Sequence, residues 1–269
     1  MHIDLLLNAV NNQINEQSNT AIIQFDKSWE QGRTIFGGIS AAVVYQAIYN
    51  KVSTDRVLRS LTTNFVGPIV YGADVHIDVD VLRQGKNVTQ VVAKAMQNDQ
   101  VCLMVQASFG VARDSKINIP STLKHQFEPP KKAKFIPQIP KVVPNYLKHL
   151  DISLSEGKMP FMGSKSSSLH GFMRFTKAPE KVTDAHIIAL IDGWPPAVLQ
   201  MLRWPAPASS MSWNLEFIHP HREIKGSDWF SYQSTTRQAA DGYAHTEANI
   251  WDAHGELIAI SRQCVTIFT

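Results

Sequence analysis

Two polar side chains lie in largely apolar stretches of the sequence, and both could take part in a reaction in which water is activated. Asp192 follows the apolar run Ile187–Ile191 and precedes the uncharged stretch GWPPAVLQML. Gln263 lies in the last predicted strand, where a buried amide needs a hydrogen-bond partner. A carboxylate can accept a proton, and an amide can hold a water without competing for its proton. The simpler alternative for Asp192 is a helix N-cap, with Pro195 in the first turn.

A glycine pair marks the start of a second uncharged stretch. Gly37 and Gly38 open the run GGISAAVVYQAIYN, which carries no charged residue. A helix that is apolar on all sides is buried on all sides. The N–H groups of its first turn have no partner within the helix, and glycine allows a substrate carbonyl to approach them closely. We therefore expect Gly37 and Gly38 to contact substrate.

Other chemistries have little support in the sequence. No G-x-S-x-G or G-x-G-x-x-G motif is present, which argues against a covalent serine hydrolase and a nucleotide cofactor. Cys102 and Cys264 are too few for a disulfide framework. His219 and His221 flank Pro220, but two histidines in one turn are too few for zinc. We expect no metal and no cofactor.

The elements that would position these residues occur twice along the chain. Each half has an uncharged helix, expected from Gly37 in the first half and after Asp192 in the second. Each helix is followed by runs with the alternating pattern of half-buried strands, ending in a hairpin. These runs are 58–68, 73–82, 87–97 and 101–113 in the first half, and 209–220, 228–238, 242–251 and 257–269 in the second.

The repeat predicts an α+β fold of two similar units. Phe65…Pro68 aligns with Phe217…Pro220 without a gap. Six of the fourteen prolines fall between Ile117 and Leu150, which predicts an irregular connector. We expect a double hot dog, with two antiparallel sheets each wrapped around a long central helix and joined at their edges. Residues 1–115 and 160–269 would form the two units, and residues 116–159 the Pro-rich connector.

The chain resembles the acyl-CoA thioesterase II type, TesB-like members of the thioesterase-like superfamily. The resemblance rests on Phe36-Gly37-Gly38 opening an Ala-rich helix and on the run SLTTNFVGP. It also rests on the hairpins VVAKAMQNDQVCLMVQASF and WDAHGELIAISRQ. The order and spacing of these segments match over nearly the whole chain apart from the connector.

This resemblance implies a catalytic triad in the second half. It assigns Asp192 as the base, with Ser210 and Gln263 holding the water, although Ser209 or Ser212 could supply the hydroxyl instead. Asn214 would lie on the same strand face as Ser210 and support substrate binding; its alternative is a solvent-facing strand residue. By alignment, the first-half counterparts of the triad are apolar, namely Phe36, Leu58 and Ala107. One active site per chain is therefore expected.

The resemblance implies a hydrolase of lipid metabolism that cleaves acyl-CoA to free fatty acid and coenzyme A. Two alternatives remain open: a non-catalytic acyl-CoA binding protein, and a hydratase or dehydratase with a His186–Asp192 pair, which the sequence spacing disfavours. Lys and Arg total 26 against 23 Asp and Glu, too weak an excess for a nucleic-acid partner. No apolar run approaches the roughly 18 residues of a membrane span. The first basic side chain is Lys27, so we expect no secretory signal. Two cysteines in apolar runs fit a reducing compartment, so we expect a cytoplasmic location. The resemblance implies a homo-oligomer.

Overall fold

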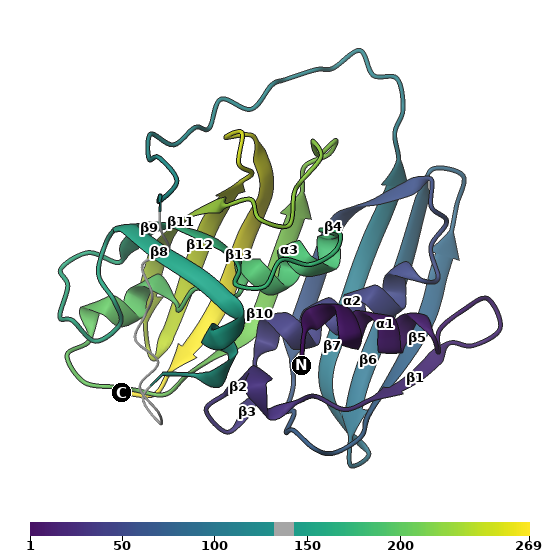
Figure 1. Cartoon of the computed structure of the whole chain (residues 1–269), viewed down its shortest axis with the longest axis horizontal. Coiled ribbons are helices and arrows are strands. Elements are labelled where there is room, and N and C mark those ends of the chain that lie inside the picture. Colours follow the sequence, from purple (N-terminus) through teal and green to yellow (C-terminus); the bar gives the residue numbers. More distant parts are fainter. Residues whose placement is uncertain (132–142) are drawn as a thin grey trace.

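A computed structural model describes residues 1–131 and 143–269 and shows one continuous antiparallel sheet with the helices on one face (Figure 1). The sheet has eleven strands in the order β1-β5-β6-β7-β4-β10-β13-β12-β11-β9-β8. The first-half strands are β1 (Thr20–Ile23), β4 (Arg56–Phe65), β5 (Val75–Gln84), β6 (Val88–Gln97) and β7 (Gln100–Val111). The second-half strands are β8 (Leu150–Glu156), β9 (Ser168–Phe175), β10 (Ala208–Phe217), β11 (Phe230–Ala240), β12 (Tyr243–Trp251) and β13 (Leu257–Ile267). A separate two-stranded ribbon consists of β2 (Glu30–Gln31) and β3 (Thr34–Ile35).

The two halves join where β4 pairs with β10, so the expected two sheets form a single one. The middle pair of this seam is Thr62 with Asn214. A β-bulge follows Leu58 in β4 and another follows Ser210 in β10, two positions that are 152 residues apart (210 − 58). Phe65 and Phe217 are separated by the same 152 residues (217 − 65). The halves are therefore related residue by residue across the seam, and neither leaves this edge unpaired.

Two short helices lie side by side on the sheet and bring their opposite ends together. Helix α2 (Gly37–Tyr49) is buried on nearly every side and packs on β5, β6 and β7. Helix α3 (Asp184–Ile191) packs against α2 and is also buried along most of its length. The start of α2 meets the end of α3, because side-chain positions at Gly37 and Gly38 would collide with Asp192.

The prediction of a long helix after Asp192 was wrong. The buried helix of the second half lies before Asp192, and Asp192 is its C-cap. After it the chain forms only a short 3-10 helix, Ala197–Met201. The physical reason is the pair Pro195-Pro196, because a proline disfavours helical backbone at the residue before it and removes a backbone donor. The second half therefore has no single long helix.

The Pro-rich segment is irregular over part of the expected range. Residues 112–131 have no helix or strand and run along the edge of the molecule from the end of β7 (Figure 1). The Trp251 indole N–H donates to the Leu123 carbonyl at 3.0 Å and fastens this segment to the second half. From Asn145 the chain forms a 3-10 helix and then β8, an edge strand paired with β9. Residues 132–142 lie outside the described residues.

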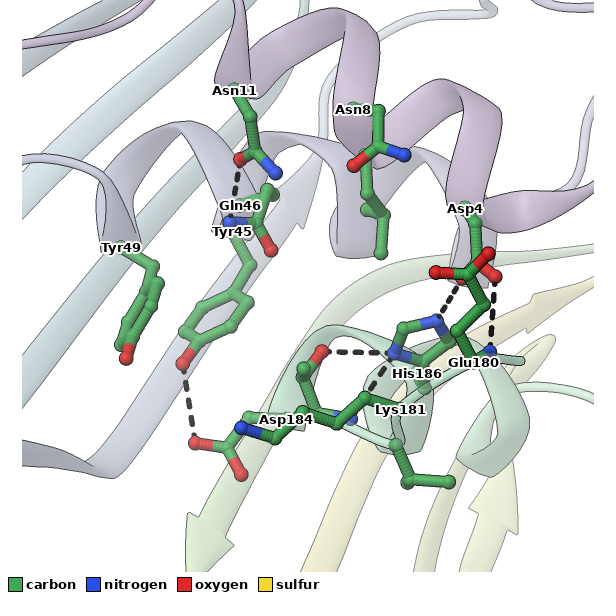
Figure 2. A pocket seen from close by; sticks show the side chains of 13 residues that line it. Asp4, Asn8, Asn11, Tyr45, Gln46, Tyr49, Glu180, Lys181, Asp184 and His186 are labelled. Atoms are coloured by element: carbon green, nitrogen blue, oxygen red, sulfur yellow. Dashed lines mark hydrogen bonds and ion pairs between the residues drawn. The ribbon is translucent and has the colours of Figure 1, made fainter. Parts of the chain in front are cut away.

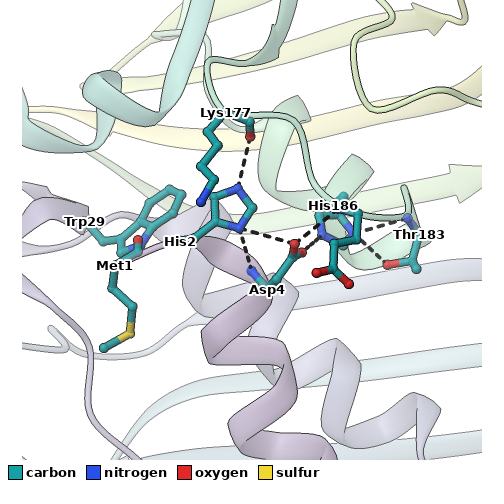
Figure 3. Close-up of polar contacts among 8 residues, drawn as sticks. Met1, His2, Asp4, Trp29, Lys177, Thr183 and His186 are labelled. Atoms are coloured by element: carbon teal, nitrogen blue, oxygen red, sulfur yellow. Dashed lines mark hydrogen bonds and ion pairs between the residues drawn. The ribbon is translucent and has the colours of Figure 1, made fainter.

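The N-terminal helix α1 (Ile3–Asn11) ties the first half to the second. Its Asp4 carboxylate accepts a hydrogen bond from His186 Nε2 at 2.8 Å (Figure 3). The Thr183 N–H donates to His186 Nδ1 at 3.1 Å, which leaves the ring proton on Nε2 for Asp4. The His2 ring also contacts the Lys177 carbonyl at 3.0 Å. Through its bonds to Asp4 and Thr183, His186 therefore helps to hold α1 against α3.

The packing of Trp194 on β9 leads to a stability prediction. A Cβ built on Gly171 would collide with the Trp194 ring and lie 2.6 Å from the Ser153 carbonyl oxygen. We expect Gly171→Ala to lower the free energy of unfolding by about 1–3 kcal/mol in urea titrations, as overpacking does. Gly67→Ala is the matched control, since the nearest atom to its Cβ would be 3.5 Å away. Equal stability of the two variants would contradict this packing.

Candidate active site

Asp192 and Gln263, which the sequence places far apart, are hydrogen-bonded to each other. The Gln263 Nε2 donates to Asp192 Oδ1 at 2.9 Å. Asp192 comes from the end of α3 and Gln263 from β13, and both side chains are partly exposed. The amide thus has the partner that its place in the last strand required, and the carboxylate is held while still accessible.

The Asp192 carboxylate also lies against the start of α2. A Cβ on Gly37 would be 3.0 Å from Asp192 Oδ2, and one on Gly38 would be 2.8 Å from Asp192 Cβ. The backbone N–H of Gly38 donates to the carboxylate. The N-cap interpretation was therefore wrong for the helix that carries Asp192, because its carboxylate faces the N-terminus of the neighbouring helix. There the helix dipole favours negative charge, whereas the end of α3 disfavours it.

Burial sets the proton affinity of this carboxyl group. Removal from water raises the pKa of Asp192 from 3.8 to about 7, while the hydrogen bonds from Gln263 and Gly38 act in the opposite direction. At neutral pH a substantial fraction of Asp192 is ionised, and that fraction is a stronger base than an ordinary aspartate. A carboxylate with such a pKa is suited to general-base catalysis.

Aromatic side chains fix the turn that follows Asp192. The Tyr146 hydroxyl donates to the Gly193 carbonyl at 3.2 Å, and its ring stacks on Phe36 at 4.1 Å between centroids. Trp194 stacks on Tyr232. The charge of Asp192 contributes to raising the pKa of both tyrosines, after burial. Sequence reasoning missed Tyr146 and Tyr232, because nothing in their spacing distinguishes them from ordinary core aromatics.

The strand register separates the three candidate serines. Ser210 is opposite Val265, and Gln263 is opposite Trp213. Val265 and Gln263 are two residues apart and share a face of β13, so Ser210 shares that face as well. Ser209 and Ser212 are opposite Thr266 and Cys264, on the other face. Within the described part of the chain no hydrogen bond joins Ser210 to Asp192 or Gln263.

Asn214 is not brought to this cluster. It is exposed, lies opposite Arg262, and accepts a hydrogen bond from the Thr62 hydroxyl at 2.9 Å. The expectation that it shares a face with Ser210 was wrong, because the bulge between Ser210 and Ser212 reverses the alternation. Asn214 shares its face with Ser212 and stabilises the β4–β10 seam.

The structure gives Asp192 a different counterpart in the first half from the one that the sequence alignment gave. Asp192 lies eight residues after the first residue of α3 (192 − 184), and Tyr45 lies eight after the first residue of α2 (45 − 37). Asp192 contacts the start of α2, and the Tyr45 hydroxyl donates to Asp184 at the start of α3. Tyr45, and not Phe36, is therefore the counterpart of Asp192. Ala107 remains that of Gln263, because Leu61 pairs with Ala107 as Trp213 pairs with Gln263.

A cavity of about 380 Å³ lies at the other end of the helix pair (Figure 2). It is bordered by α1, the C-terminal end of α2 and the N-terminal end of α3, and neither Asp192 nor Gln263 lines it. His186 lines this cavity and is bonded to Asp4 and Thr183. His186 therefore does not form the pair with Asp192 that a hydratase would need. Of the helices in the described ranges, none is long and apolar enough to cross a membrane.

Comparisons with known proteins agree with this architecture. Residues 25–110 match the family model of the acyl-CoA thioesterase N-terminal domain, and residues 123–267 match that of the acyl-CoA thioesterase C-terminal domain. Acyl-CoA thioesterase 2 of Haemophilus influenzae is 33% identical over 79 residues, which span 29% of this chain and 28% of that protein.

Solved structures show the same fold at low sequence identity. A hot dog fold protein of unknown function from Alicyclobacillus acidocaldarius superposes with a TM-score of 0.84 at 19% identity, over 98% of both chains. The acyl-CoA thioesterase II TesB2 of Mycobacterium marinum superposes with a TM-score of 0.75 at 18% identity, also over 98% of both chains. The fold is therefore a hot dog fold, and by its two matched domains the chain belongs to the acyl-CoA thioesterase family.

Proposed function

We propose that this protein is an acyl-CoA thioesterase that hydrolyses acyl-CoA to a free fatty acid and coenzyme A. The observation that supports this most strongly is the Asp192 carboxylate. Its pKa is raised to about 7, and it is held between the Gln263 amide and the start of α2. Family membership supplies the substrate class, and the site supplies a base that is active near neutral pH.

The proposed reaction uses one water and no covalent intermediate. Asp192 accepts a proton from a water that Ser210 and Gln263 help to hold, and the hydroxide oxygen attacks the thioester carbonyl. The Gly38 N–H already serves Asp192, so we assign the Gly37 N–H to the developing oxyanion. The tetrahedral intermediate then expels the coenzyme A thiolate, which takes the proton from Asp192. The products are the fatty acid and coenzyme A with a free thiol.

The remaining expectations stay predictions. These are a cytoplasmic location and a homo-oligomer. The non-catalytic acyl-CoA binding alternative has a clear signature of its own, since such a protein would bind acyl-CoA and release no thiol.

Replacing the base tests the mechanism directly. Asp192→Asn preserves the shape and removes the proton acceptor, so we expect turnover to fall about 100- to 10,000-fold. The measurement is free-thiol release from a panel of acyl-CoA substrates of different chain length. Asp80→Asn, at an exposed position on β5, is the control and should retain activity. Full activity of Asp192→Asn on every substrate that the unmodified protein cleaves would refute the assignment.

The pKa of Asp192 predicts opposite pH effects on activity and stability. Activity should rise with pH around a midpoint near 7, since only the ionised carboxylate accepts a proton. The pKa of Asp192 in the folded protein lies above the ordinary value of 3.8, so folding favours its protonated form. This contribution to stability is complete below pH 3.8 and is lost as pH rises through about 7. Asp192→Asn should therefore raise Tm at pH 8 and change it little at pH 4.

Gln263→Leu should shift the pH midpoint of activity upward, because it removes a hydrogen bond that lowers the pKa of Asp192.

The three serines give a matched test of strand register. Ser210→Ala should lower turnover, because Ser210 shares the strand face of Gln263. Ser209→Ala and Ser212→Ala remove the same atom from the opposite face and should leave turnover within about twofold. Steady-state thiol release and a circular-dichroism melt of each variant separate catalytic loss from misfolding. A larger loss for Ser212→Ala than for Ser210→Ala would show that the hydroxyl was assigned wrongly.

A further inference from the structure

Two histidines that follow β10 meet an aspartate at the start of α3. The ligand atoms of Asp184, His219 and His221 all lie within 4.8 Å of one another. Asp184 Oδ1 is 4.0 Å from His221 Nδ1, and the two imidazole rings stack at 4.1 Å between centroids. This cluster is separate from Asp192, which lies at the opposite end of α3.

Both histidines have a ring nitrogen that lacks a partner. Within the described ranges, the Nε2 atoms of His219 and His221 are buried and form no hydrogen bond. A buried polar atom left without a partner costs about 1–3 kcal/mol.

The aspartate is oriented toward the histidines by a neighbouring phenol. The Tyr45 hydroxyl donates to Asp184 Oδ2 at 3.2 Å (Figure 2), and the other carboxylate oxygen faces His221. Such a hydrogen bond to a ligating carboxylate is typical of metal sites. Asp184 also lines the 380 Å³ cavity, which gives a small ion a path to the cluster.

The surrounding charges favour a cation on balance. Asp252 is buried, its Oδ2 atom has no hydrogen-bond partner in the described part of the chain, and its charge acts on His221. The positive charges that act on His219 are those of His221, when it is protonated, and of Arg59. When His221 is neutral, the carboxylates of Asp184 and Asp252 therefore outnumber the Arg59 guanidinium among the fixed charges near the two histidines.

We propose that Asp184, His219 and His221 bind one divalent transition-metal ion of the zinc class. Two imidazoles and one carboxylate form a donor set typical of Zn²⁺, and three protein ligands leave a position for water. Metal–ligand bonds of about 2.0–2.2 Å would draw the donors somewhat closer than they are here, which side-chain rotation can supply. The ion ties the start of α3 to the chain that follows β10. From the sequence, His219 and His221 were too few to predict a zinc site. The third ligand, Asp184, lies in another element and is far from them along the chain.

Zn²⁺ binding to the untagged full-length chain tests this proposal without reference to thioesterase activity. After treatment with chelator and its removal, calorimetric titration with Zn²⁺ should give one site per chain with a micromolar or lower Kd. Co²⁺ should bind in its place and give the visible absorption of a site with nitrogen and oxygen ligands. Zn²⁺ should also raise Tm by a few degrees.

Variants decide whether the three named residues form the site. His219→Ala, His221→Ala and Asp184→Asn should each weaken Zn²⁺ binding at least tenfold, and Tyr45→Phe should weaken it less. His254→Ala, at an exposed histidine, should bind as the unmodified chain does. Where an alanine variant does not fold, His221→Gln takes its place. Absence of binding at 100 µM Zn²⁺, or binding that survives loss of both His219 and His221, would overturn the proposal.

Discussion

The contact between the Asp192 carboxylate and the first turn of α2 is the constraint on which the rest of the site depends. A carboxylate at the end of its own helix faces the negative end of that helix dipole, and burial adds to the cost of its charge. The N–H groups of α2 offset part of this cost, but only if the two backbones come very close. Gly37 and Gly38 permit that approach, because a Cβ at either position would meet Asp192 or Phe65.

The antiparallel pairing of α2 and α3 explains why this contact exists at all. When two helices lie side by side in opposite directions, each start lies next to the end of the other. The two halves of the sheet are equivalent, as the bulges after Leu58 and Ser210 show. The helix pair that lies on this sheet therefore has an equivalent contact at each of its two ends. One end places an acid against glycines, and the other places Tyr45 against Asp184. The two ends therefore have the same backbone arrangement and different chemistry.

Much of this could be predicted from the sequence, and what failed did so for identifiable reasons. The repeat around Phe65 and Phe217 predicted the four strands that follow the helix in each half, in their order along the chain, because strand alternation and turn residues are local signals. It gave no range for β1 or β9 and placed β8 inside the connector. The pairing of Asp192 with Gln263 followed from the family resemblance. The position of Asp192 on its helix did not, because two prolines shift the helical segment to residues before it. Asn214 was misplaced because a bulge has no clear local signature and reverses every side chain beyond it.

The stability and the chemistry of the site make opposite demands on Asp192. Deeper burial would raise the pKa of its carboxyl group further and leave it protonated at neutral pH, so it could not act as a base. More hydrogen bonds would lower that pKa toward the ordinary value and weaken the base. One amide from Gln263 and one backbone N–H from Gly38, against partial burial, hold the pKa near neutrality. Tyr146 and Tyr232 are close enough for the charge of Asp192 to raise the pKa of each phenol, and neither forms a hydrogen bond to the carboxylate in the described structure. Partial burial thus raises the pKa of Asp192, and the carboxylate stays accessible to the water whose proton it accepts.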